Sequence, residues 1–321
     1  MSLSLFVCRC LLSRFVLYRV RVLTFYLLLL HVFYMPVWML GAFPAPFVIT
    51  VGVPKGGDCK TWTAFNLASR LGFWGYDVVA IDSNPMHDLW KDHQSLVQNG
   101  IWPRFDVIAH DPLDTQGNQT DTLDVSSQRH RDFIVYDTSQ YVQLRTTRWA
   151  WTYCNLMILP VCPYAAQIPN YMEALQLYLA LPSPRAPILV LPCRVRVLKN
   201  SIPQRRLEDL LDFLGNQGCI VPPFKGHYQI PESETIASQD TRWIFSETVY
   251  EGKKRALHPD LITRVDISLA WIKMEIERLY GAFPAPKLLP VSMNHREEMM
   301  SHLAREFAQG KSPMGSASAR R

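Results

Sequence analysis

The sequence predicts an α/β protein with a mostly parallel, doubly wound sheet and helices on both faces. Short apolar runs alternate along the 321 residues with segments in which apolar residues recur at helical spacing. Apolar runs without polar alternation are typical of strands that are buried on both faces. A glycine-containing loop separates the first apolar run from the first helical segment, as in phosphate-binding loops. These observations predict a parallel sheet whose ligands bind beyond the carboxyl ends of its strands.

The expected elements follow one another in a regular order. The strand candidates are the short apolar runs at 47–53, 77–82, 105–109, 132–137, 156–161, 187–193 and 218–221. Helical spacing predicts helices between them at 61–73, 86–98, 144–153, 168–181 and 203–216. A closing helix is predicted over 259–280, because its apolar residues recur on one face. Lys55, Asp82 and Asp137 follow or end three of the strands, so a parallel sheet brings them to one edge.

One loop carries most of the functional information in the chain. Residues 51–61 read Val-Gly-Val-Pro-Lys-Gly-Gly-Asp-Cys-Lys-Thr. In such a loop the backbone N–H groups and the positive end of the following helix face a phosphate group. Lys60 adds positive charge, and the Thr61 hydroxyl is a ligand for Mg²⁺. The alternative is a chance Gly-Gly turn before a helix, which the strand–loop–helix context and the second lysine, Lys55, disfavour.

The pattern Lys-Gly-Gly-x-x-Lys-Thr at 55–61 resembles the deviant Walker A loop of the ParA/MinD partition ATPases. Three more segments follow in the order of that family. Residues 64–82 resemble its "NLA…L…G…V…ID" signature, 132–138 its Walker B strand, and 155–163 its "LIPVxP" strand. The resemblance spans roughly residues 47–280. Within the family, 82–90 and 194–204 resemble relatives that are encoded on plasmids and conjugative elements.

The resemblance implies a P-loop ATPase that binds ATP and Mg²⁺ and converts ATP to ADP and phosphate. It assigns the nucleotide to Lys55, Gly56, Gly57, Asp58, Cys59, Lys60, Thr61 and Trp62. Thr61 and Asp137 are the implied metal ligands, and Asp82 is the implied catalytic residue that orients the attacking water. Lys55 is the second implied catalytic residue and reaches the nucleotide of a partner subunit. ATP is therefore expected to drive formation of a homodimer.

Several residues depart from the pattern of the family. Cys59 replaces a glycine, and its Cβ can obstruct the approach of the backbone to a phosphate. Pro54 lacks an N–H group, Trp62 replaces a small hydroxyl residue, and Asn84 stands where many relatives have a second Asp. Ser139 and Gln140 replace the usual prolines after the Walker B strand. The alternative function is therefore a degenerate, non-hydrolysing interaction protein of the same fold.

Binding to DNA is expected to depend on a local basic cluster. The net charge of +5 owes four of its charges to the arginines of the first 34 residues, which contain no acid. The cluster consists of Arg194, Arg196, Lys199, Arg205 and Arg206, and its alternative is a solvated surface. The resemblance implies non-specific DNA binding, plasmid or chromosome partition or conjugative transfer, and a centromere-binding or relaxosome-type adaptor. It also implies the cytoplasm and the nucleoid as the location.

The N-terminal residues conflict with this function. Residues 22–40 contain no Asp, Glu, Lys or Arg and are long enough to cross a bilayer. The arginines before them would keep the N-terminus in the cytoplasm and place the phosphate loop on the side without ATP. The alternatives are an interfacial anchor or hairpin, a signal peptide, or translation that begins at Met35 or Met39. The late start is favoured, so no membrane attachment is expected unless 22–40 is retained.

Three regions are expected: an N-terminal extension at 1–46, an ATPase domain at 47–280 and a tail at 281–321. The tail is predicted to hold a short helix near 291–308 and a disordered basic end. The seven cysteines are scattered, which disfavours zinc sites and disulfides and excludes reductases and arsenical pumps with paired cysteines. Membrane-attached tyrosine kinases carry a C-terminal tyrosine cluster, whereas here no tyrosine follows Tyr280.

Overall fold

The computed structural model describes the sheet, its helices and most of their connections. The described residues are 46–52, 59–98, 103–120, 125–141, 143–162, 168–181, 185–193, 202–223, 259–281, 283 and 285–286. The chain divides into two units. The larger unit consists of Ala45–Ile276 and Pro284–Arg321 and holds the whole sheet. In the smaller unit, Met1–Pro44 with Glu277–Phe283, the described residues are the end of the last helix and two residues beyond it.

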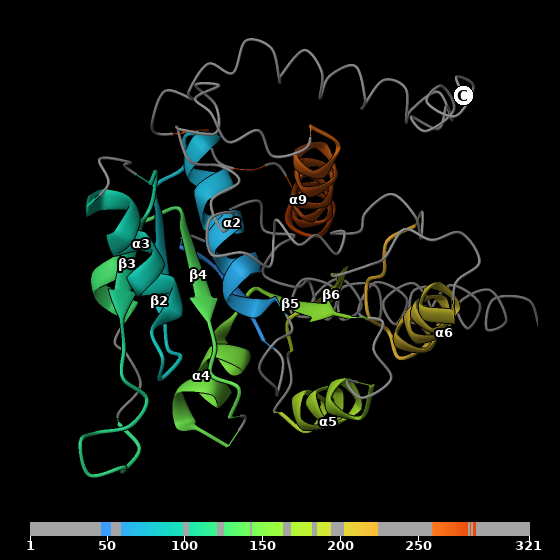
Figure 1. Ribbon diagram of the computed structural model, residues 1–321, viewed down its shortest axis with the longest axis horizontal. Helices are drawn as coiled ribbons and strands as arrows, with labels where there is room; N and C mark the ends of the chain where they lie inside the picture. Colours follow the sequence, from blue (N-terminus) through green and yellow to red (C-terminus); the bar gives the residue numbers. More distant parts are fainter. Residues whose placement is uncertain are drawn as a thin grey trace, which may run out of the picture. The chain divides into compact units, whose positions relative to one another are not determined.

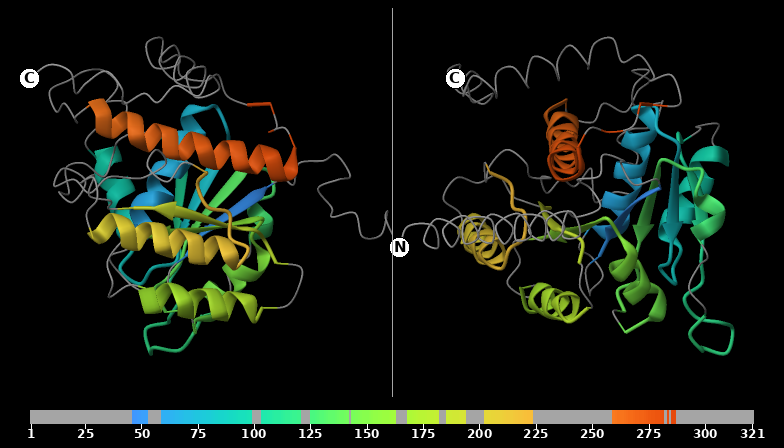
Figure 2. Two further views of the ribbon diagram at one scale, coloured as in Figure 1. Left: turned by 90° about the vertical axis from the view of Figure 1, so that its right-hand side faces the viewer. Right: turned by 180° about the vertical axis from the view of Figure 1, so that it is seen from behind.

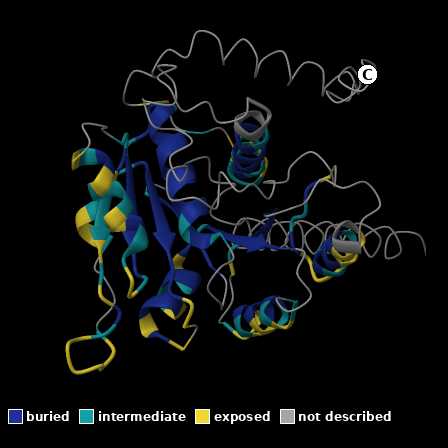
Figure 3. Ribbon diagram, viewed as in Figure 1, coloured by how far each residue is buried: buried dark blue, intermediate teal, exposed yellow. Residues whose placement is uncertain are grey.

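The core of the larger unit is a parallel sheet of six strands (Figure 1). Its strands are β1 (Phe47–Val51), β2 (Val78–Asp82), β3 (Asp106–Ala109), β4 (Phe133–Asp137), β5 (Leu156–Val161) and β6 (Ile188–Pro192). Their order is β3-β2-β4-β1-β5-β6, and every neighbouring pair is parallel. All strands except the edge strand β3 are buried along their length, which explains their continuous apolar sequences (Figure 3).

Helices cover both faces of this sheet (Figure 2). The described α-helices are α2 (Lys60–Phe73), α3 (Asp88–Gln98), α4 (Arg145–Tyr153), α5 (Ile168–Leu179), α6 (Ile202–Asn216) and α9 (Pro259–Tyr280). The apolar sides of α4, α5 and α6 form one continuous core with alternate residues of the strands. α2 and α9 lie on the other face, where Arg70 of α2 meets Asp266 of α9 at 3.8 Å.

The helix α2 is the most deeply buried of these helices. All but one of its residues are buried, including the polar side chains of Lys60, Thr63 and Asn66. Its last turn lies against the chain before β3, because a Cβ on Gly72 would lie 2.1 Å from the carbonyl oxygen of Arg104. The close contact explains why the last turn of this helix contains glycine. The N-terminus of α2 is thereby fixed beside the carboxyl end of β1.

The structure confirms the predicted fold class and six of the seven strands. The prediction of a strand at 218–221 is wrong, since Ile220 makes only an isolated parallel bridge with Leu189. Pro222 and Pro223 follow directly, and they lack the N–H groups that would continue the ladder. Among the helices that the structure describes, none has the length and apolarity needed to span a membrane. The segments predicted at 22–40 and 291–308 lie outside the described residues.

Candidate functional site

The carboxyl ends of the three central strands meet at the site. The register pairs Asp137, the last residue of β4, with Val51 of β1 on one side and Asp82 of β2 on the other. Past these ends, the Ser83 N–H donates to the Asp137 carbonyl and the Thr138 N–H donates to the Val51 carbonyl. The sheet hydrogen bonding thus extends one residue beyond the strands and fixes both acids side by side.

Asp137 is fully buried and meets the first turn of α2. The Thr61 hydroxyl donates to its Oδ2 at 2.8 Å. Burial raises the pKa of the Asp137 carboxyl to about 8; the charge of Asp82 adds to this, while the Thr61 hydrogen bond and Lys60 oppose it. Its other oxygen, Oδ1, is buried and has no hydrogen-bond partner among the described residues. A hydroxyl beside a buried carboxylate with an unused oxygen fits Mg²⁺, which prefers oxygen ligands.

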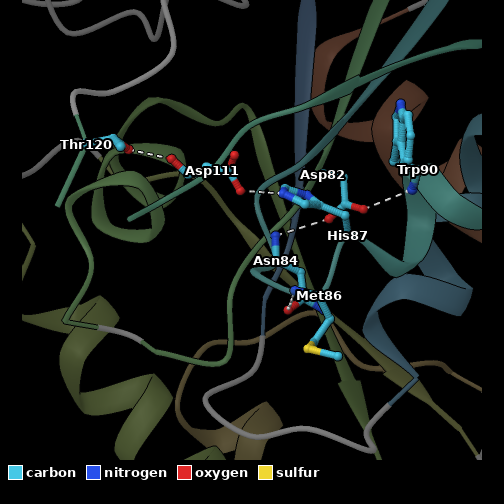
Figure 4. Close-up of polar contacts among 7 residues, drawn as sticks. All are labelled: Asp82, Asn84, Met86, His87, Trp90, Asp111 and Thr120. Atoms are coloured by element: carbon cyan, nitrogen blue, oxygen red, sulfur yellow. Dashed lines mark hydrogen bonds and ion pairs between the residues drawn. The ribbon is translucent and has the colours of Figure 1, made fainter. Parts of the chain in front are cut away.

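Asp82 is also fully buried, but both of its oxygens are engaged. Its Oδ1 accepts the Asn84 N–H at 3.0 Å, and its Oδ2 accepts the Trp90 N–H at 2.9 Å (Figure 4). Burial raises the pKa of the Asp82 carboxyl, and these two hydrogen bonds oppose the shift. Asp82 therefore joins the loop after β2 to the first turn of α3. The same contacts hold its carboxylate in one orientation.

Two further residues extend this arrangement to the loop after β3. The Nε2 of His87 lies 2.6 Å from Oδ1 of Asp111, and the Asp111 carbonyl accepts the Thr120 hydroxyl at 2.5 Å (Figure 4). The side chain of Asn84 turns back onto its own loop and accepts the Met86 N–H at 3.3 Å. Neither His87 nor Asp111 was predicted as a site residue. The available signal was that both residues follow strands at the same edge of the sheet.

Cys59 precedes α2 in a left-handed conformation, with φ 60° and ψ 18°. Its carbonyl accepts the Thr63 N–H at 2.8 Å, as expected of a residue that begins a helix. A residue with a Cβ in this conformation costs about 1–2 kcal/mol, which a glycine avoids. The departure at Cys59 is therefore accommodated at the cost of backbone strain. The thiol faces the end of β6, where burial first and then Cys59 raise the pKa of the Cys193 thiol.

The structure places the other predicted site residues as follows. Lys60 is 7% exposed at the first position of α2, directly before Thr61, and Trp62 is buried on the same helix. Arg205 and Arg206 are exposed on α6. Outside the described residues lie Lys55, Gly56, Gly57, Asp58, Arg194, Arg196 and Lys199. The described part of the predicted nucleotide site is thus assembled from α2, β2 and β4, and of the predicted DNA cluster only the α6 residues are described.

Solved structures of several proteins resemble this chain. Apo McdA from Cyanothece has a TM-score of 0.52 at 15% identity and is covered over 99% of its length by 70% of this chain. An ATP complex of a McdA variant from Cyanothece has a TM-score of 0.51 at 14% identity, and the match covers 74% of this chain and 98% of that protein. A ParA family ATPase from Chlorobium tepidum has a TM-score of 0.46 at 16% identity, and the match covers 71% of this chain and 97% of that protein. No protein-family model and no curated protein matches the sequence. The McdA structures confirm the α/β fold of this chain, which it shares with them.

Proposed function

We propose that the protein is a ParA-like ATPase that binds ATP together with Mg²⁺. The observation that carries the proposal is the contact between Thr61, at the start of α2, and Asp137, at the end of β4. A hydroxyl from the helix after the phosphate loop and an acid from a neighbouring strand are the pair that holds Mg²⁺ in P-loop enzymes. Lys60 lies beside them and lowers the pKa of Asp137 by its charge.

The N-terminus of α2 suits a phosphate chain. None of the residues in its first turn, which the structure describes in full, is acidic. The partial positive charge of the helix end is therefore left to attract an anion. Lys60 contacts the β- and γ-phosphates in this proposal, together with the loop residues Lys55–Asp58. Bound Mg²⁺ supplies neutralisation of the phosphate charge, and Thr61 and Asp137 fix its position.

The degenerate alternative remains a second candidate, because one observation favours it. Both oxygens of Asp82 accept backbone N–H groups, and the carboxylate is fully buried. A water molecule can be oriented by Asp82 only through a remaining lone pair of these oxygens. The strained Cys59 adds a Cβ where the family has glycine. A protein that binds ATP but hydrolyses it slowly is consistent with both features.

The biological role follows the fold group only as a proposal. ATP binding drives a homodimer in which Lys55 reaches the nucleotide of the partner subunit. The dimer binds DNA non-specifically through Arg194, Arg196, Lys199, Arg205 and Arg206, of which the exposed pair on α6 is described. This mechanism serves the partition or transfer of a mobile element. It acts with an adaptor protein, in the cytoplasm or on the nucleoid. Arg205→Ala/Arg206→Ala is expected to weaken DNA binding for all sequences and to reduce its salt dependence.

Calorimetry with Mg²⁺–ATP and Mg²⁺–ADP tests the nucleotide site. Wild-type protein is expected to release or absorb heat with both nucleotides, whereas Lys60→Ala is expected to lose the signal. Asp137→Asn keeps the shape of the carboxyl but is expected to lose the dependence on Mg²⁺. Steady-state release of phosphate, compared with Lys60→Ala, then separates the ATPase from the degenerate alternative. Wild-type protein that binds neither nucleotide contradicts the proposed function.

A further inference from the structure

His87 combines an unusual backbone with a specific side-chain contact. Its φ of 47° is left-handed, a conformation in which residues other than glycine are uncommon. Its N–H donates to the Asn84 carbonyl at 2.8 Å, and its carbonyl accepts the Lys91 N–H at 2.9 Å. His87 therefore closes the turn after β2 and also begins α3. Strained residues persist where the surrounding contacts hold them in place.

The contact that holds His87 crosses to another strand connection. Its Nε2 lies 2.6 Å from Oδ1 of Asp111, which follows β3. A carboxylate can only accept, so the imidazole N–H is the donor. The side chain of His87 is 18% exposed although that of Asp111 is 73% exposed, so the imidazole lies inward of its partner. The Nδ1 of His87 is buried and has no partner among the residues that the structure describes.

The turn that His87 closes also donates hydrogen bonds to the Asp82 carboxylate. The two N–H groups on the Asp82 carboxylate belong to Asn84 and Trp90, on either side of His87 in the sequence. The backbone of Asp82 is also tied to the β3 exit, since its carbonyl accepts the His110 N–H at 2.8 Å. A bond from His87 to Asp111 therefore closes a ring of contacts around Asp82, which includes both strand exits (Figure 4).

We propose that His87 and Asp111 form a positioning pair that holds the loop after β2 in the strained form in which its N–H groups orient the Asp82 carboxylate. The pair does not touch the reacting atoms; it acts through Asp82. Its effect on hydrolysis rests on the proposed function, whereas its effect on the loop does not. The alternative is a purely stabilising surface contact. A variant that relieves the backbone strain at His87 while it removes the bond to Asp111 distinguishes the two roles.

The separating variant is His87→Gly. Glycine adopts the left-handed conformation freely, so His87→Gly relieves the strain while it removes the bond to Asp111. Relief of the strain offsets the loss of the bond in overall stability under either role, whereas only a positioning pair predicts a loosened Asp82. Asp111→Ala removes the same bond without a change at His87. Asp111→Asn keeps an acceptor oxygen for the imidazole and is the conservative rescue.

Amide hydrogen exchange by NMR reads the loop directly and needs no activity. In His87→Gly and Asp111→Ala, the Asn84 and Trp90 amides are expected to exchange at least about tenfold faster. The Arg148 amide, which begins α4 by donating to Leu144, is the internal control and is expected to stay unchanged. The double variant is expected to match His87→Gly, because Asp111→Ala then has no bond left to remove. Unchanged exchange at Asn84 and Trp90, or equal acceleration at Arg148, overturns the proposal.

Kinetics give the second readout. With wild-type protein that hydrolyses ATP, His87→Gly and Asp111→Ala are expected to lower kcat by about ten- to 100-fold while KM changes little, since misplacement acts on the catalytic carboxylate. Asp111→Asn is expected to recover most of kcat. Asp114→Ala, in the same exposed hairpin, is the matched control with unchanged kcat. A kcat that stays at the wild-type value in these variants overturns the proposal. Wild-type protein that does not bind ATP contradicts the proposed function alone. In that case, amide exchange at Asn84 and Trp90 still tests whether His87 and Asp111 position the loop.

Discussion

At the scale of single residues, the site is dominated by two buried carboxyls at paired positions at the ends of β2 and β4. Burial raises the pKa of both, and Asp82 raises that of Asp137 further. A raised pKa means that the folded protein binds protons that the unfolded chain releases. In the proposed Mg²⁺ site, a cation between Asp137 and Thr61 would relieve the same unfavourable charge, so we expect protons and Mg²⁺ to compete for this site.

The first prediction concerns pH and Asp137. Its pKa rises from 3.8 in the unfolded chain to about 8 in the folded protein, so its contribution to stability is full below pH 4 and is lost as pH rises to 8. The free energy of unfolding without Mg²⁺ is therefore expected to fall across this range. Urea unfolding at constant ionic strength measures it. Asp137→Asn is expected to flatten the slope, and an equal slope in that variant contradicts the assignment.

The second prediction concerns Cys59. Cys59→Gly removes the Cβ and the strain of about 1–2 kcal/mol at φ 60°. Because glycine also costs about 0.5–1 kcal/mol of entropy on folding, the free energy of unfolding is expected to rise by at most about 1.5 kcal/mol. The affinity for Mg²⁺–ATP is expected to rise in calorimetry. Cys59→Ser keeps the Cβ and is the control; equal gains in both variants would mean that the thiol, not the Cβ, obstructs the nucleotide.

At the scale of elements, α2 is held by contacts at both of its ends. Its first turn meets Asp137, and its last turn meets the chain before β3. The close approach at Gly72 leaves no room for a side chain, whereas a Cβ on Gly215 of α6 would lie 3.4 Å from its nearest neighbour, a Val221 methyl. Packing therefore requires glycine at position 72, whereas the glycine at position 215 can be replaced by a larger residue.

The third prediction compares these glycines. Gly72→Ala forces a Cβ against the Arg104 backbone and is expected to destabilise the protein by about 1–3 kcal/mol. Gly215→Ala meets only ordinary contacts and is expected to be neutral or to stabilise by up to about 1 kcal/mol, from helix propensity. Urea unfolding of the pair measures the difference. Similar values for the two variants would show that the turn before β3 moves aside freely.

The elements were predictable from the sequence because most strands are buried on both faces and read as apolar runs. Asp82 and Asp137 were placed together correctly, since parallel strands end at one edge. The conformation of Cys59 and the bond from His87 to Asp111 were not predictable. Periodicity indicates strands and helices, but not the path of a loop or a contact between residues 24 positions apart. The seventh strand failed for a local reason, the two prolines after Val221.

At the scale of the whole larger unit, α9 closes the face that holds α2. Its residues Val265, Leu269, Ile272 and Ile276 are buried, as the predicted apolar face required. Asp266 is fully buried and lies 3.8 Å from Arg70 of α2, and Arg70 also stacks over Trp74. The pair joins residues that lie almost 200 positions apart in the sequence. A segment near the end of the chain is therefore required to complete the layer around the site.

The fourth prediction tests this closure. Asp266→Ala removes the carboxylate that lies 3.8 Å from the buried Arg70 and is expected to cost about 3–5 kcal/mol of unfolding free energy, measured in urea. The double variant Arg70→Met/Asp266→Leu replaces the pair by apolar side chains and is expected to recover much of this loss. A double variant as unstable as Asp266→Ala would mean that the layer depends on the charges themselves.

The place of β1 has a consequence for synthesis of the chain. Of the strands that the structure describes, Phe47–Val51 leaves the ribosome first, but it lies between β4 and β5. Its two neighbours are complete only after Val161 has emerged. For more than a hundred residues of translation, this largely apolar strand lacks its neighbours in the sheet and exposes surface that favours aggregation. We therefore expect early binding of a chaperone to reduce aggregation of the nascent polypeptide.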